Sequence, residues 1–305
     1  MIQPPSLSAR SGAAFAAAAY GLWGVFPIYF KAVASVPAIE VLAHRIVWTV
    51  VVMAMLLSAR RGWWLRVITV FGNRRLLATL SVSATTLALN WGVFVWAVAD
   101  GRVLECSLGY FINPLVSVLL AVFVLRERLR APQWLAIGLA AAGVVYLIVA
   151  VGTPPWVGLT LAVSFGVYGL LRKMAPVDAV SGLFIEAAVL LPLAAGYLIW
   201  LAIAGGGAFG IGDPRLDLLL IAAGPITALP LILFVAGAHR IRLVTLGLLQ
   251  YIAPTGHFLL AVLVYDEAFT MTRFIAFACI WTALVVYTVD AVRFQRQGRA
   301  GIVRG

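Results

Sequence analysis

Charged side chains are scarce in this chain. Of its 305 residues, only 11% are Asp, Glu, Lys or Arg, whereas soluble domains carry about 25%. Hydrophobic residues make up 64% of the chain, and the mean hydropathy is +1.06. Segment after segment reaches the roughly 20 apolar residues that cross about 30 Å of hydrocarbon. The composition therefore excludes an ordinary soluble domain and predicts an all-α membrane protein.

Residues that commonly build catalytic, metal or disulfide sites are also few. The chain has two cysteines and three histidines, and both cysteines fall in predicted spans, so neither a disulfide framework nor a metal cluster is expected. It contains no HExxH motif, phosphate loop or nucleophile elbow. We therefore expect no cofactor and no ATPase, and any active transport would have to draw on an ion gradient.

Two other function classes are alternatives to transport. The segments "GIGD" (210–213) and "YD" (265–266) resemble the paired aspartates of intramembrane aspartyl proteases, which share a proton in a wet membrane site. Their order is reversed, however, and both aspartates lie in predicted outer loops. A membrane receptor or scaffold that binds without transporting is the other alternative. A long soluble domain would favour it, and the short connections leave no room for one.

Hydropathy with breaks at Gly, Pro and charge clusters predicts ten membrane spans. Short tails, 1–11 and 293–305, would flank them. The predicted spans are 12–33, 38–58, 75–98, 103–125, 132–150, 156–171, 182–203, 216–236, 243–264 and 272–292.

The basic residues orient these spans. The net charge of +11 could suggest nucleic acid, but most of the 22 basic residues gather in alternate loops and in the tails. The positive-inside rule then puts both termini in the cytoplasm, so no nucleic-acid partner is needed. The loops contact the surface of the lipid bilayer. The residues assigned to the cytoplasmic side are Arg10, Arg60, Arg61, Arg66, Arg74, Arg75, Arg126, Arg128, Arg130, Arg172, Lys173, Arg240, Arg242, Arg293, Arg296, Arg299 and Arg304.

The chain also contains an internal repeat. "INPLVSVLLAVFVLRE" (112–127) resembles "IAPTGHFLLAVLVYDE" (252–267) without gaps, at an offset of 140 residues. Residues 12–150 and 156–292 would then each hold five spans, and an odd number of spans inverts the second copy. Inverted repeats are typical of secondary transporters, which bind substrate where the repeats meet.

Several segments together resemble a known family. They are "AHRIVW" (43–48), "NWGVFVWAV" (90–98), "SLGYFINPL" (107–115), "LLRK" (170–173), "LFIEAAVLLP" (183–192) and "LQYIAPT" (249–255). Together they are similar to the RarD-type permeases, in the EamA branch of the drug/metabolite transporter superfamily. The resemblance implies ten transmembrane helices in two inverted five-helix repeats, both termini cytoplasmic, in a bacterial inner membrane. It also implies a small-molecule substrate, either an amino-acid-like metabolite or an amphenicol-like compound.

Polar stripes in three predicted spans give the candidate substrate site. In 103–125 the polar residues recur at helical spacing, and the repeat partner 243–264 carries its own set at the 140-residue offset. Lipid cannot satisfy such groups, so they face one another or a watery cavity. Bonding between packed helices is the alternative. The predicted substrate-binding residues are Asn90, Trp91, Tyr110, Asn113, Gln250, Tyr251 and His257.

A charged pair in the second predicted span is the last feature. His44 and Arg45 lie about six residues inside it, where an arginine costs roughly 2.5–3.5 kcal/mol. Snorkelling to the headgroups would be one explanation. At an offset of 142, His44 matches Glu186 in the other half. Our hypothesis is that these residues gate or couple transport: Arg45 or His44 meets an anionic group of the substrate, and Glu186 takes up a proton or binds a cationic substrate group.

Overall fold

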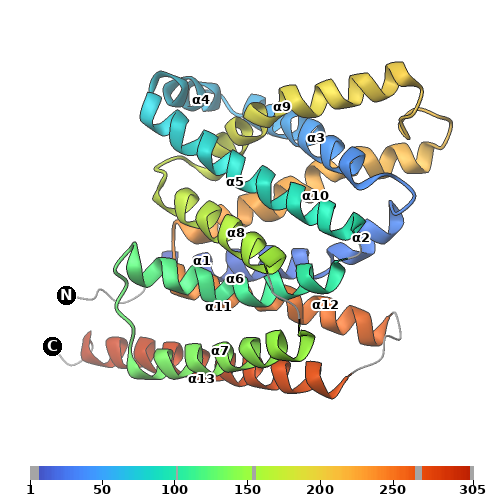
Figure 1. Ribbon diagram of the computed structural model, residues 1–305. Helices are drawn as coiled ribbons and strands as arrows, with labels where there is room; N and C mark the ends of the chain where they lie inside the picture. The colour runs from blue at the N-terminus through green and yellow to red at the C-terminus, as the bar shows by residue number, and fades with distance from the viewer. Residues whose placement is uncertain (1–6, 101, 153–155, 265–269, 303–305) are drawn as a thin grey trace.

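A computed structural model describes residues 7–100, 102–152, 156–264 and 270–302, and this part of the chain is helical without strands (Figure 1). Asp266 and Glu267, which entered the protease and repeat comparisons, lie outside the described residues. The helices are α1 (Leu7–Gly24), α2 (Phe26–Ala32), α3 (Ala38–Ser58), α4 (Trp63–Gly72), α5 (Arg74–Ala99), α6 (Val103–Phe123), α7 (Ala131–Val151), α8 (Trp156–Met174), α9 (Ala179–Ala204), α10 (Pro214–Ala238), α11 (Leu243–Leu249), α12 (Ile252–Leu263) and α13 (Met271–Ile302).

The all-α membrane fold predicted from composition is confirmed. Among the described residues, nine helical segments are long and apolar enough to cross a membrane. The fourth predicted span coincides with α6, whose apolar part, Leu108–Phe123, is shorter. Three elements differ from the prediction. The helix α4 lies where only a basic loop was expected, α1 begins inside the predicted tail 1–11, and α13 continues to Ile302, inside the predicted tail 293–305.

Two spans are broken, and prolines explain where. Pro27 has no N–H to donate to the carbonyl of Trp23, four residues earlier, and the helix divides there into α1 and α2. Pro254 likewise leaves the carbonyl of Gln250 without its usual donor, and α11 gives way to α12 at Gln250 and Tyr251. Pro114, by contrast, lies inside an unbroken α6.

The helices pack as one bundle around a shared apolar core. α1 packs against α10 and α12, α8 packs against α5 and α6, and α7 pairs with α13 along one side (Figure 1). Where α1 crosses α12, the backbones meet at Gly24 and Gly256. A Cβ at Gly256 would lie 2.9 Å from the Cα of Gly24, so only glycine permits this approach.

Both ends of the described chain lie at the same end of the molecule, together with α4 (Figure 1). We call this the terminal end. The opposite end, which we call the far end, carries α2 and the turn 205–213.

Candidate functional site

Arg45 lies at the centre of the candidate site, on α3. Its Nε donates a 2.9 Å hydrogen bond to Oγ1 of Thr227 on α10. Its guanidinium lies 4.5 Å from the ring centroid of Trp91 on α5 and 5.6 Å from that of Phe30 on α2. No carboxylate pairs with it among the residues that the structure describes. Arg45 is therefore a membrane-embedded cation held by one hydroxyl and two aromatic faces, with hydrogen-bond donors to spare.

Tyr110 and His257 form the neighbouring part of the site. Tyr110 on α6 meets His257 on α12 edge to face, with centroids 5.5 Å apart, and Phe94 on α5 at 6.3 Å. Nε2 of His257 lies 2.9 Å from the carbonyl of Trp23, the group that Pro27 leaves without a helical donor. Because a carbonyl only accepts hydrogen bonds, Nε2 carries the hydrogen.

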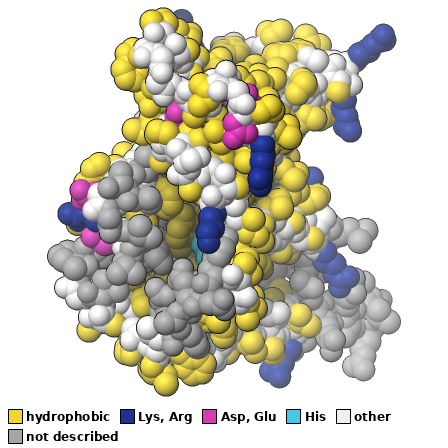
Figure 2. Space-filling view, turned by 90° about the vertical axis from the view of Figure 1, so that its right-hand side faces the viewer, with side chains coloured by type: hydrophobic (Ala, Val, Ile, Leu, Met, Phe, Trp, Pro, Cys, Tyr) yellow, Lys and Arg dark blue, Asp and Glu magenta, His cyan; other side chains and the backbone are white. Residues whose placement is uncertain are grey.

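Arg45, Trp91, Tyr110 and His257 all keep some exposed surface, and we call the open space beside them the recess. Figure 2 looks onto the far end and shows the surface hollowed near its centre, with a histidine visible in the depth. Tyr110 remains 37% exposed although Phe94 and His257 pack against its ring. Arg45 and Trp91 are partly exposed as well. The recess therefore combines a cation with several aromatic faces.

The other predicted substrate-binding residues are placed differently. Nδ2 of Asn90 donates to the carbonyl of Leu161 at 2.8 Å and to Oγ of Ser164 at 3.0 Å, so Asn90 joins α5 to α8. Tyr251 is fully buried, and its hydroxyl donates to the carbonyl of Phe111. Both residues therefore take part in helix contacts.

Asn113 and Gln250 are buried, each 6% exposed. Oδ1 of Asn113 has no hydrogen-bond partner among the described residues. Gln250 lies at the break between α11 and α12. For these two residues, substrate binding stays a prediction.

His44 makes other contacts than Arg45, its neighbour in sequence, and a role in gating stays a prediction for it. Its Nε2 lies 3.9 Å from Oε1 of Glu40, and the same oxygen accepts a hydrogen bond from the backbone N–H of Ala208. The ring of Phe209 lies 5.2 Å from the ring of His44. His44 and Glu40 therefore hold the turn 205–213 at the far end.

Glu186 has a partner that the sequence did not reveal. Nε of Arg172 lies 3.5 Å from Oε1 of Glu186, and Oγ of Ser83 donates to the same oxygen at 2.6 Å. Arg172 is completely buried, and its carbonyl accepts from His239. The sequence assigned Arg172 to a cytoplasmic loop because it ends an apolar span next to Lys173. No pattern in the sequence indicates that its side chain turns back into the bundle.

A small cavity lies between Glu186 and the surroundings of Arg45. It measures about 20 Å³ and is lined, among others, by Glu186, Thr49, Trp91 and Thr227. This space suits about one water molecule. Since Trp91 and Thr227 also contact Arg45, the cavity lies between the recess and the buried carboxylate.

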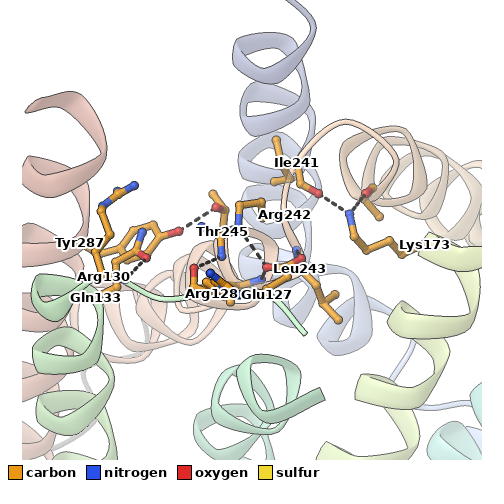
Figure 3. A network of polar contacts seen from close by, with 12 residues as sticks. Glu127, Arg128, Arg130, Gln133, Lys173, Ile241, Arg242, Leu243, Thr245 and Tyr287 are labelled. Carbon is orange, nitrogen blue, oxygen red and sulfur yellow. Dashed lines mark hydrogen bonds and ion pairs between the residues drawn. The ribbon is translucent and has the colours of Figure 1, made fainter. Parts of the chain in front are cut away.

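At the terminal end a polar network joins the segment after α6 to α7, α8, the end of α10, α11 and α13 (Figure 3). The two carboxylate oxygens of Glu127 accept the backbone N–H groups of Leu243 and Val244, at the start of α11. Nε of Arg242 lies 3.3 Å from Glu127, and Arg242 also donates to the carbonyl of Arg128. We call Glu127, Arg242 and the start of α11 the clamp.

Two further contacts belong to the same polar network. Arg130, just before α7, binds the carboxylate of Asp290 on α13. Nζ of Lys173 donates to the carbonyls of Ala238 and Ile241, where α10 ends. Burial lowers the pKa of His239, beside this end of α10. These contacts hold the terminal end of the bundle together.

Comparison with known proteins identifies the family. Residues 10–149 match the model of the EamA-like transporter family. An uncharacterized transporter of Vibrio cholerae is 47% identical over 95% of this chain and 96% of its own. Protein RarD of Escherichia coli K12 is 45% identical over 94% and 97%. A crystal structure with 22% identity has the same fold, with a TM-score of 0.70 over 93% of this chain and 99% of the other. The chain therefore belongs to the EamA-like transporter family, as a RarD-type membrane transporter.

Proposed function

We propose that this protein is a secondary transporter of the bacterial inner membrane that moves a small metabolite or drug-like molecule by alternating access. The observation that carries the proposal is Arg45: a cation without a carboxylate partner among the described residues, partly exposed and in contact with the rings of Trp91 and Phe30. An embedded charge is costly, so it is expected to serve a ligand. In this proposal the terminal end, and with it both termini, lies in the cytoplasm, which the positive-inside rule supports because the basic loops gather at that end.

In this proposal the recess lies between two inverted five-helix halves, 12–150 and 156–292. The packing supports this relation. At the offset of about 140 residues, α1 corresponds to α8, α3 to α9, α5 to α10, and α6 to α11 with α12. The contact of α1 with α10 then has its counterpart in α8 with α5, and that of α3 with α10 in α9 with α5. The bond from Tyr251 to Phe111 joins positions 140 apart.

Arg45 would bind an anionic group of the substrate. A guanidinium can hold a carboxylate through two parallel hydrogen bonds, and the rings of Trp91, Phe30 and Tyr110 would cover apolar parts of the molecule. An amino-acid-like metabolite offers such a carboxylate. An amphenicol-like amide lacks it and would rely on ring contacts and neutral hydrogen bonds.

Glu186 would couple transport to protons through its contact with Arg172. While both are charged they compensate each other in the bundle. A proton on Glu186 would leave the guanidinium of Arg172 buried without a counter-charge, which is strongly unfavourable. The bundle would then have to rearrange before Arg172 regains a partner, and this links proton uptake to a change of state. Water in the small cavity would bring the proton from the recess.

Ligand binding by the purified protein tests the proposed site. Amino acids and amphenicol-like amides are added one by one, and the melting temperature is measured for the native protein, Arg45→Lys and Arg215→Lys. Arg215 lies at the far end, exposed, at the start of α10. A compound of the substrate class that carries a carboxylate should stabilise the native protein and Arg215→Lys. Arg45→Lys should lose most of this effect, because an ammonium cannot hold a carboxylate in bidentate fashion. Equal stabilisation of all three proteins would place the ligand elsewhere.

A further inference from the structure

The helix α4, absent from the sequence prediction, has three distinct faces. Val67 and Val70 are buried against the bundle. On the next face, four large apolar side chains are exposed by 38–65%. They are Trp64, Leu65, Ile68 and Phe71. The third face carries Arg66 and Thr69, both exposed. An exposed apolar face beside a polar one is typical of a helix that lies in a membrane interface.

Arginines surround this helix. The segment 59–75 contains five of them and no acidic residue, and all five are exposed: Arg60, Arg61, Arg66, Arg74 and Arg75. The guanidinium carbons of Arg60 and Arg66 lie 4.8 and 5.7 Å from the ring of Trp63. The only carboxylate near them in the described part of the chain is Asp178, 3.7 Å from Arg66. The positive charge therefore exceeds what the protein itself compensates.

The helix also touches the segment that carries Glu186. Trp64 meets Phe184 of α9 edge to face, with centroids 5.2 Å apart. Val67 and Val70 belong to the same apolar cluster as Ile185. A ligand that fixes the position of α4 would therefore also fix the end of α9 that contains Glu186.

We propose that α4 and its arginines form a binding site for anionic phospholipid in the leaflet at the terminal end. The phosphate lies against Arg60, Arg61 and Arg66, and the acyl chains cover Leu65, Ile68 and Phe71. A soluble anion would satisfy the arginines but leave the apolar face in water. A zwitterionic lipid would cover that face but contribute no net negative charge. Only an anionic lipid matches both.

Native mass spectrometry of the detergent-purified protein tests this proposal without any transport substrate. The bound lipids are counted while phosphatidylglycerol or phosphatidylcholine is added. The test variant combines Arg60→Gln, Arg61→Gln and Arg66→Gln. The matched control combines Arg126→Gln, Arg128→Gln and Arg293→Gln, which removes the same charge from exposed positions near the same end. Inorganic phosphate is a separate arm.

The native protein and the control should prefer phosphatidylglycerol, and the test variant should lose this preference, by about fivefold in affinity for each arginine that contacts a headgroup. A second variant, Leu65→Ser with Ile68→Ser, should weaken the binding of both lipids. Equal lipid binding by test and control variants would overturn the proposal. So would competition by inorganic phosphate at the concentration at which the lipid binds, because the site would then recognise a soluble anion. Either failure leaves the proposed transport function untouched.

Discussion

At the residue scale, the buried charges distinguish this molecule from a merely apolar bundle. Arg45 and Glu186 could be selected from the sequence because a charge within an apolar run is visible there. Arg172 could not, because a basic residue at the end of a span looks like a loop residue. Polarity and spacing predict Asn90 and Tyr251 as site residues. Polarity and spacing do not, however, distinguish a side chain that joins two helices from one that faces a cavity.

The contact between Arg172 and Glu186 predicts that removing one of the two charges destabilises the protein more than removing both. Arg172→Gln leaves the carboxylate of Glu186 buried with Ser83 as its remaining hydrogen-bond donor, and it should lower the free energy of unfolding by about 3–5 kcal/mol. The double variant Arg172→Gln with Glu186→Gln removes both charges and should recover much of this loss. Denaturant unfolding in micelles measures both. If the double variant is as unstable as the single one, no charge compensation exists between the two.

The same carboxylate predicts a functional effect. Glu186→Gln keeps an acceptor for Ser83 but cannot exchange a proton, and adding Arg172→Gln removes the guanidinium that would otherwise be buried without a counter-charge. In this double variant ligand binding should therefore persist, whereas the dependence of transport on a proton gradient should disappear. Uptake into vesicles with and without an imposed pH difference checks this. A variant that still responds to the gradient like the native protein would exclude Glu186 from coupling.

At the scale of the elements, hydropathy predicted the spans because each must cover the same hydrocarbon thickness. The helix α4 was missed because its ten residues are too short to span and lie among arginines. The break between α1 and α2 was missed because the run 12–33 stays apolar across Pro27. A proline alone does not predict a break, because α6 continues past the missing N–H of Pro114.

The start of α11 predicts how the terminal end opens. Glu127→Gln removes the charge that faces Arg242 and weakens the hold on the N–H groups of Leu243 and Val244. A cysteine at Ser117, where α6 meets α11 at Gly247, should then react faster with a membrane-impermeant maleimide from the terminal side.

The labelling is done in a background of Cys106→Ser and Cys279→Ser. Arg128→Gln is the control, because Arg128 contacts the clamp only through its backbone carbonyl, which accepts from Arg242. Labelling that is equally slow in both variants would show that Glu127 does not keep this end closed.

At the scale of the whole molecule, the proposed site is built from both parts of the chain. Arg45, Trp91 and Tyr110 come from the first half of the sequence, and Thr227 and His257 from the second. The 140-residue offset relates Tyr110 to Gln250 in the predicted span 243–264. It did not predict that Thr227 binds Arg45, because an offset relates equivalent positions, and these two are not equivalent.

Uptake by the purified protein in liposomes is the most direct test of transport. The compound that stabilises the native protein is labelled and supplied outside the vesicles. Its uptake is followed into vesicles with the native protein, vesicles with Arg45→Lys and protein-free vesicles. We predict uptake with the native protein, uptake lowered at least about tenfold with Arg45→Lys, and no uptake without protein. A compound that binds at Arg45 but never enters the vesicles would contradict transport and make the protein a membrane receptor.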